Sequence, residues 1–264
     1  MRIKIYFQNF VIKIQQSRFV FLVPIKFIKK LLQILNFSRC SFNRVIRWQT
    51  LLKKQPYIHL GCGDTRIIGA INVDARSTSA TDIRYNCTSL EIFPSNHFEG
   101  VFSNAFWEHV FLNNRLHVIE ECQRVLKENG FALFLGIPDF ERVAKAYLNK
   151  EPGITTKIFD LSQVYRFTHG GPESTPSWWF ENLHKSLFDV YTINEILLTA
   201  QFSSWIIFRY SYGEERVPGQ LGFLAYKNSS EDVESMHKKL ILLIDEFNIK
   251  YVNISSLEIV SINN

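Results

Sequence analysis

The chain has few cysteines, no long apolar run and no acidic residue among its first 63 positions. Its four cysteines are scattered, form no C-x-x-C pair and complete no zinc-binding motif with histidine, which favours free thiols in a reducing cytosol. Before residue 57 the longest charge-free runs are Ile5–Ile12 and Leu31–Ser38. Both are well short of the roughly 18 apolar residues that a membrane-spanning helix needs. We expect no signal peptide, because positive charges interrupt every early apolar run.

The 264 residues are 46% hydrophobic and 14% aromatic, which excludes a mainly disordered chain and predicts one globular domain. Charge is unevenly distributed along the sequence. Residues 1–56 hold twelve of the 30 basic residues, and the other 18 share the remaining chain with all 25 acidic residues. We therefore predict a basic leader over 1–56, a mildly acidic domain over 57–228, and a C-terminal helix and tail over 229–264.

The leader contains a basic amphipathic helix that follows Pro24. Lys26, Lys29, Lys30 and Gln33 recur at helical spacing on one side, and isoleucines and leucines occupy the other. One interpretation is a helix that lies on an anionic membrane surface. The other is a helix that packs its apolar face on the domain and leaves its lysines in water. An organelle transit peptide is a weaker alternative, because serine is scarce and lysine outnumbers arginine.

The first apolar run of the domain, residues 57–60, is a predicted buried strand that ends abruptly at Gly61 and Gly63. A second β-prone run follows and ends at Asp74. In parallel sheets, ligands bind outside the carboxyl ends of the strands, where glycines allow close backbone approach and a carboxylate can hold a ribose. The dinucleotide fingerprint lacks its third glycine, because Arg66 occupies that position. NAD and FAD are therefore disfavoured.

Strands and helices alternate through the rest of the domain, which predicts an α/β fold. The sequence predicts further strands over 82–86, 100–105, 131–137, 203–210 and 221–226, and helices over 116–127, 140–150, 192–201 and 231–247. The turn at 213–219 joins the last two strands as a hairpin.

With these elements in place, the sequence resembles the class I S-adenosylmethionine-dependent methyltransferases. It is most similar to bacterial methyltransferases of the type 11-like group associated with surface-polysaccharide biosynthesis. Four segments carry the resemblance: HLGCGDTRIIGAINVD (59–74), SNAFWEHV (103–110), RVLKENGFALFLGIPDF (124–140) and NLHKSLFDVYTINEILLTAQF (182–202). The resemblance implies a Rossmann-like, seven-stranded, mostly parallel sheet with an antiparallel edge hairpin. It also implies S-adenosylmethionine as cofactor and a cytoplasmic enzyme, peripheral to the membrane if the leader binds lipid.

The resemblance further implies which residues hold the cofactor. His59, Gly61, Cys62 and Gly63 would shape the methionine end, Asp74 would hold the ribose, Asn86 and Cys87 would flank the adenine, and Ser103, Asn104 and Ala105 would run beneath the sulfonium. Two residues depart from the family pattern. His59 stands where many relatives have a carboxylate, and Asn86 replaces an aspartate often found beside the adenine. An amide oxygen can still accept from the adenine amine.

Candidate acceptor-activating residues are Glu108, His109, His169 and His184, because a hydroxyl acceptor benefits from a general base. The segment 152–186 is long and rich in glycine, proline and aromatics, so it is expected to form a lid or acceptor pocket. Trp178 and Trp179 could stack on sugar rings, or they could pack as a flap without a ligand role. We therefore expect O-methylation of a sugar or glycan intermediate, with no metal.

Two alternatives remain open on the sequence. A nucleic-acid methyltransferase would use the basic leader to contact phosphates. Against it, the Asn/Asp-Pro-Pro-aromatic signature of amino-directed nucleobase methyltransferases is absent at 103–106. The other alternative is a non-catalytic scaffold with this fold that docks on a membrane or a partner through the leader.

Overall fold

The computed structural model describes residues 50–153, 157–170, 179–213 and 215–263. Within these ranges the strands are β1 Tyr57–Leu60, β2 Ala70–Asp74, β3 Ile83–Arg84, β4 Phe98–Asn104, β5 Leu126–Pro138, β6 Ser204–Tyr212, β7 Gln220–Tyr226 and β8 Val252–Asn263. The helices are α4 Arg115–Val125, α5 Phe140–Leu148, α6 Leu161–His169, α7 Val190–Thr199 and α8 Val233–Glu246. Three short 3-10 turns complete the described elements: η2 Trp107–His109, η3 Leu112–Asn114 and η4 Trp179–Asn182.

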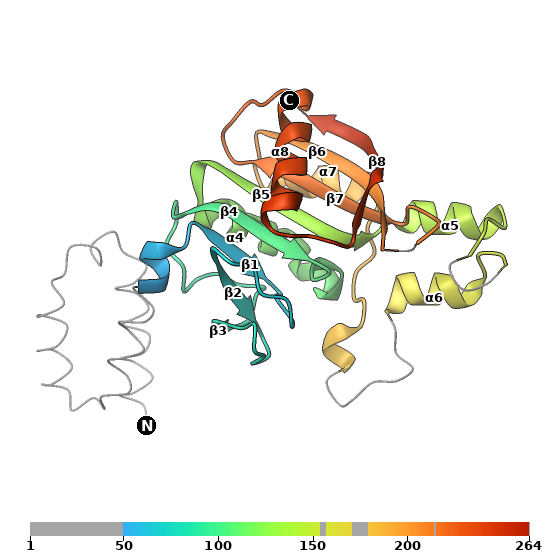
Figure 1. The fold of residues 1–264 in the computed structure, drawn as a ribbon, viewed down its shortest axis with the longest axis horizontal. Helices are drawn as coiled ribbons and strands as arrows, with labels where there is room; N and C mark the ends of the chain where they lie inside the picture. The colour runs from blue at the N-terminus through green and yellow to red at the C-terminus, as the bar shows by residue number, and fades with distance from the viewer. Residues whose placement is uncertain (1–49, 154–156, 171–178, 214, 264) are drawn as a thin grey trace, which may run out of the picture.

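All eight strands join one sheet in the order β3-β2-β1-β4-β5-β7-β6-β8 (Figure 1). Strands β1 to β5 pair in parallel wherever they are neighbours, and β7 runs antiparallel between β5 and β6. This confirms the predicted Rossmann-like α/β fold with a mostly parallel sheet. Strand order reverses at β1 and β4, and ligands bind in the crevice at such a switch point.

The predicted count of seven strands is wrong, because β8 adds an eighth. It pairs antiparallel with β6 and so covers the edge that the hairpin of β6 and β7 was expected to form. The C-terminal segment, predicted as a helix and a tail, therefore contributes both α8 and an edge strand to the same sheet. An added strand satisfies backbone groups of β6 that would otherwise face water.

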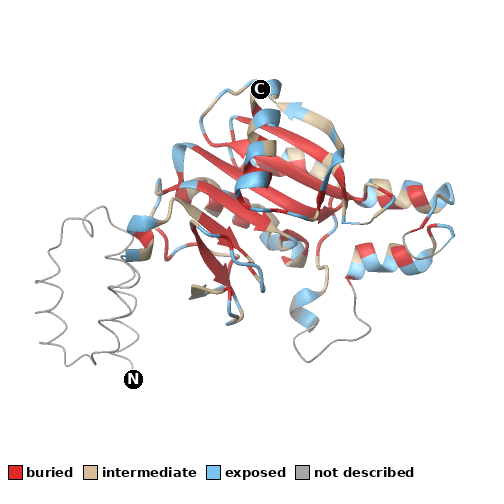
Figure 2. Ribbon diagram, in the orientation of Figure 1, coloured by how far each residue is buried: buried red, intermediate tan, exposed pale blue. Residues whose placement is uncertain are grey.

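Helices cover both faces of the sheet. Helices α4 and α7 bury apolar residues in one cluster, and α8 buries a stripe in another. The α8 stripe recurs at helical spacing, as expected for a helix that packs one face on a sheet: Met236, Leu240, Leu243 and Ile244. Figure 2 shows the central strands buried and the outer surface of α8 exposed. Between β1 and β2 no helix intervenes, so this crossover is short, as the sequence indicates.

Residues 50–54 are helical and pack on the domain. Leu52 is buried in the core, and its carbonyl oxygen lies 2.9 Å from Nε2 of His97. The end of the leader is therefore part of the folded domain. Residues 1–49, with the predicted amphipathic helix, lie outside the described residues, so membrane contact stays a prediction. In the part of the chain that is described, no helix combines the length and apolar character that a membrane crossing requires.

The predicted insertion 152–186 contains α6, which packs beside α5 at one end of the sheet (Figure 1). Phe159 and Phe167 are buried there against Val143 and Ala146 of α5. Each of these helices begins at an aspartate whose side chain accepts backbone N–H groups, Asp139 for α5 and Asp160 for α6. Trp178 and the other residues of 171–178 lie outside the described residues.

Candidate active site

A cavity of about 640 Å³ lies at the carboxyl ends of β1, β2 and β4. The ends of these strands and the segment 182–185 line it. Its size falls in the range of ordinary small-molecule sites, and its place at the strand-order switch matches the position where α/β sheets bind ligands.

The floor of the cavity is a tight backbone bend after β1. Gly61 and Gly63 both have positive φ angles, +64° and +51°, which side chains strongly disfavour. A Cβ on Gly61 would also fall 2.7 Å from Cβ of Phe106, so that position has no room for a side chain. The hydroxyl of Thr78 donates to the Gly63 carbonyl at 2.6 Å and holds the bend. The bend thus exposes backbone to the cavity, where a ligand can approach closely.

Asp74, at the end of β2, faces this bend. Its Oδ2 accepts the backbone N–H of Gly63 at 2.7 Å, and its Oδ1 accepts the backbone N–H of Arg76 at 2.7 Å. Asp74 is 7% exposed and lines the cavity. Each carboxylate oxygen has a further lone pair that can accept a ribose hydroxyl. The predicted convergence of the glycine bend and Asp74 is therefore present, and ribose binding fits it.

His59 is buried below the same bend. Its Nδ1 lies 3.1 Å from Oδ1 of Asn72, and its ring packs on Phe102. Burial lowers the pKa of His59 to about 4, so the imidazole is neutral at physiological pH. His59 lines the cavity as an uncharged group.

Residues predicted beside the adenine lie on the cavity wall. Asn86 is exposed there, and its Oδ1 accepts both the backbone N–H and the hydroxyl of Thr88. Cys87 is buried, with Sγ 3.5 Å from the carbonyl oxygen of Val73. Burial raises the pKa of Cys87 to about 12 and that of Cys62 to about 11, so both side chains remain thiols. They contribute shape to the cavity and no charge.

The end of β4 agrees with the prediction only in part. Asn104 and Ala105 line the cavity. Ser103 does not, because its side chain points into the sheet and donates to the Leu60 carbonyl at 3.2 Å. Its prediction beneath the sulfonium is therefore corrected. The backbone of Ala105 has a positive φ of +49°. It packs closely on Gly136, where a Cβ would lie 2.8 Å from the Ala105 nitrogen, so only glycine fits there.

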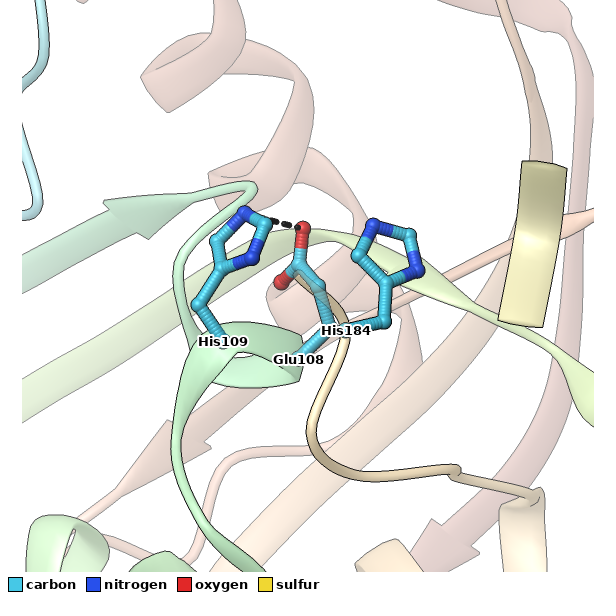
Figure 3. Close-up of side chains that lie close together, drawn as sticks. All are labelled: Glu108, His109 and His184. Atoms are coloured by element: carbon cyan, nitrogen blue, oxygen red, sulfur yellow. Dashed lines mark ion pairs between the residues drawn. The ribbon is translucent and has the colours of Figure 1, made fainter. Parts of the chain in front are cut away.

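Three of the four predicted acceptor-activating residues meet in space. Glu108 and His109 lie in η2, and His184 lies 75 residues later in the chain (Figure 3). The Glu108 backbone carbonyl accepts the N–H groups of Lys185 and Ser186 at 2.7 and 3.2 Å, which holds the two segments together. One ligating atom from each of the three side chains lies within 4.8 Å of the others.

Hydrogen bonds fix which ring nitrogens carry protons. Nδ1 of His109 lies 3.1 Å from the Leu183 carbonyl oxygen, and Nδ1 of His184 lies 2.7 Å from that of Phe167. A carbonyl only accepts, so each Nδ1 donates and each Nε2 keeps a free lone pair in the neutral ring. Burial lowers the pKa of His109 to about 4 and lowers that of His184, so both rings are neutral.

Glu108 is 2% exposed, and burial raises its pKa to about 8. Its Oε1 lies 3.6 Å from Nε2 of His109. Its buried Oε2 has no hydrogen-bond partner among the described residues. An unpartnered buried carboxyl oxygen is costly, and such groups concentrate at functional sites.

A second cavity of about 230 Å³ adjoins the first and shares Ala105, Glu108, Gly170 and His184 with it. Its other lining residues are mostly polar or aromatic: Gly136, Pro138, Arg166, Phe167, Tyr212, Glu215 and Gln220. The cluster of Glu108 and His184 therefore lies at the junction of the two cavities.

His169 does not join this cluster. Its ring is exposed, stacks on Tyr165 with centroids 4.6 Å apart, and has Nδ1 2.8 Å from the Thr168 hydroxyl. It lines neither cavity. Its candidacy as a catalytic base is corrected, because the last turn of α6 directs the side chain outward.

Sequence reasoning missed several lining residues. Arg76 could have been found, because it follows Asp74 by two positions at the same strand end. No sequence pattern marked the lining residues that come from the hairpin and from the segment before β8, namely Tyr212, Glu215 and Tyr251. Tyr212 and Tyr251 stack with ring centroids 4.7 Å apart beside the junction.

This chain is similar to known proteins in part of its sequence and in its fold. Residues 59–134 match a family described as a methyltransferase domain. No curated protein matches the sequence. The solved structures similar to this chain include three S-adenosylmethionine-dependent methyltransferases. That from Archaeoglobus fulgidus is 15% identical, with a TM-score of 0.46 over 76% of this chain and 99% of that one. That from Methanosarcina mazei is 19% identical, with a TM-score of 0.42 over 69% and 97%.

The third, a possible histamine N-methyltransferase from Thermotoga maritima, is 13% identical, with a TM-score of 0.43 over 70% of this chain and 95% of that one. These similarities concern the fold and leave the acceptor open. The sheet order is that of a Rossmann-like α/β fold, and the match of residues 59–134 to the methyltransferase-domain family supports S-adenosylmethionine as the cofactor.

Proposed function

We propose that this protein transfers a methyl group from S-adenosylmethionine to a hydroxyl of a sugar or glycan intermediate. The observation that carries the proposal is the junction of two cavities, one built like a nucleoside site and the other polar, with Glu108 and His184 lining both. A methyltransferase needs this arrangement, because cofactor and acceptor must meet in line.

The larger cavity fits the cofactor. The carboxylate of Asp74 would hold the ribose hydroxyls, and the backbone at Gly61 and Gly63 would lie against the adenosyl and methionine portions. Asn86 and Cys87 would border the base. When bound, the cofactor supplies a methyl group on a positively charged sulfur. An acceptor oxygen can attack the methyl carbon and displace the sulfur from it.

The smaller cavity would hold the acceptor. Its wall presents Arg166, Tyr212, Glu215 and Gln220, which can donate and accept hydrogen bonds as a hydroxyl-rich ligand requires. Gln220 Nε2 donates to Glu215 Oε1 at 3.2 Å, which orients that carboxyl group. Its polar lining supports a sugar over an apolar acceptor, and the resemblance to enzymes associated with polysaccharide biosynthesis supports the same class.

His184 is suited to remove the hydroxyl proton. Its Nδ1 is fixed on the Phe167 carbonyl, so Nε2 has a lone pair to accept a proton at the junction. The lowered pKa keeps the ring neutral and able to act as a base. The backbone bonds from Lys185 and Ser186 to the Glu108 carbonyl keep this histidine next to η2.

The proposal can be tested by incubating the protein with methyl-labelled cofactor and a panel of free sugars, nucleotide sugars and lipid-linked glycans. We expect label on a hydroxyl of at least one member, and His184→Ala should slow the transfer about 100-fold or more, the usual contribution of a general base. His117→Ala, at an exposed position on α4, is the matched control. Transfer of label to RNA or DNA and to no sugar would contradict the proposal.

A further inference from the structure

We propose that Glu108, His109 and His184 bind a divalent transition-metal ion at the junction of the two cavities (Figure 3). The site is assigned from these side chains alone and does not depend on methyl transfer. It revises the expectation, drawn from the sequence, that the protein has no metal.

The spacing of the three groups suits coordination. Ligands about 2.1 Å from a tetrahedral ion lie about 3.4 Å from one another. Oε1 of Glu108 and Nε2 of His109 are already 3.6 Å apart, and all three ligating atoms lie within 4.8 Å. Binding an ion would therefore draw the three groups closer together than they are in this structure.

The groups around the ligands match those of known metal sites. A metal-binding histidine commonly donates its other ring N–H to a backbone carbonyl, which fixes the tautomer and aims the free nitrogen at the ion. His109 does so with Leu183, and His184 does so with Phe167. Two neighbouring histidines held in this way leave two Nε2 lone pairs facing the same region.

Glu108 provides an independent observation. Its carboxyl group is fully enclosed, and Oε2 has no hydrogen-bond partner among the described residues. A buried carboxyl oxygen without a donor is costly unless something else satisfies it. A cation bound by both carboxylate oxygens of Glu108, together with the two imidazoles, would supply that missing partner.

Two imidazoles and one carboxylate select for the kind of ion. Imidazole suits zinc, copper, iron and nickel, whereas magnesium and calcium prefer sites made of oxygen ligands. Three protein ligands also leave at least one position open, as in catalytic zinc sites. Glu108 and His184 line both cavities, so the open position would face the space where an acceptor oxygen would lie. This last step rests on the proposed function: with Nε2 of His184 bound to the ion, the ion would lower the pKa of the acceptor hydroxyl, and solvent water would take up its proton in place of His184.

Metal binding can be measured without cofactor or acceptor. Full-length protein, freed of any affinity tag and stripped with chelator, is titrated with Co²⁺ and followed by its visible absorption and by calorimetry. We expect one Co²⁺ per chain, displacement of Co²⁺ by Zn²⁺, and little competition from Mg²⁺. Glu108→Gln and His184→Ala each remove a direct ligand and should weaken Co²⁺ binding more than about 100-fold. Removing a residue that only hydrogen-bonds to a ligand typically weakens metal binding by about 10- to 100-fold. His169→Ala removes an exposed histidine close in sequence to the cluster and should bind Co²⁺ like the unmodified protein.

Folding of each variant is checked by its thermal transition without metal, and Glu108→Gln keeps the shape of the buried side chain. Co²⁺ should raise the transition temperature of the unmodified protein and of His169→Ala, and not that of the ligand variants. No Co²⁺ or Zn²⁺ binding at millimolar concentration, or equal binding by Glu108→Gln, would overturn the site. Binding of S-adenosylhomocysteine is measured on the same samples, so a failure of the proposed function is seen separately from a failure of the metal site.

Discussion

The backbone N–H of Gly63 donates a hydrogen bond to Oδ2 of Asp74 over 2.7 Å, and thereby joins the bend after β1 to the end of β2. Eleven positions separate the two residues in sequence, and the parallel pairing of β1 with β2 brings them together. Through this bond, a carboxylate that can hold a ribose and a backbone that can contact a ligand form one wall of the larger cavity.

The bend itself makes a prediction about Gly61. Gly61→Ala should lower the free energy of unfolding by about 1–3 kcal/mol for the backbone strain and by about 1–3 kcal/mol more for the clash with Phe106. Gly213→Ala is the matched control, because Gly213 has a similar φ of +58° and no atom within 4 Å of an added Cβ. Urea unfolding of both variants measures the difference. Equal losses would show that Phe106 does not restrict Gly61.

The buried His59 predicts a loss of stability in acid. Its folded-state pKa of about 4 lies below its ordinary value of 6.5, so between these values the unfolded chain takes up a proton that the folded chain does not. The stability is fully present above pH 6.5 and should fall by about 3 kcal/mol as the pH drops to 4.

Urea unfolding at several pH values, compared with His59→Leu, isolates this contribution from that of other histidines. In the variant, Oδ1 of Asn72 still accepts the backbone N–H of Ile67 at 2.9 Å, so the neighbouring network keeps a donor. We expect a shallower acid slope for His59→Leu. If stability falls equally with pH in both proteins, His59 takes up its proton as readily in the folded chain as in the unfolded chain.

The basic leader predicts binding to anionic lipid. Replacing Lys26, Lys29 and Lys30 with Gln should reduce co-sedimentation with anionic vesicles roughly 100-fold, at about 1 kcal/mol for each lysine near the surface. Neutral vesicles serve as the control. Substitution is preferable to deletion of 1–56, because Leu52 is buried in the core. Unchanged partitioning of the triple variant would rule out electrostatic contact with the membrane through these three lysines.

Local patterns predicted most of the sheet, and the failures have physical reasons. Strand β8 carries apolar residues such as Ile254, Leu257 and Ile262, but its register against β6 shifts twice. Each shift breaks the regular alternation by which an edge strand is recognised in sequence. Strand β3 is shorter than predicted: Ile83 and Arg84 are in register with β2, and Asp82 and Tyr85 beside them each donate one backbone N–H to it.

The site divides in the same way. Gly61, Gly63 and Asp74 were predictable, because a bend and a carboxylate at adjacent strand ends must lie at one edge of a parallel sheet. The meeting of His184 with Glu108 could not be predicted, because it depends on backbone bonds from Lys185 and Ser186 to Glu108, which lies more than 75 positions earlier in the chain. The sequence showed that His169 and His184 were both candidates, and only the direction of each side chain separates them.

The most direct test of this account is calorimetric titration of the full chain with S-adenosylhomocysteine. We predict one binding site per chain. The affinity of Asp74→Ala should be at least about 10-fold lower, because a hydrogen bond to a charged group is lost. Thr78→Val should lose less affinity, because it loosens the bend at Gly63 but keeps the Asp74 carboxylate. Absence of binding at millimolar ligand, or undiminished binding by folded Asp74→Ala, would contradict it.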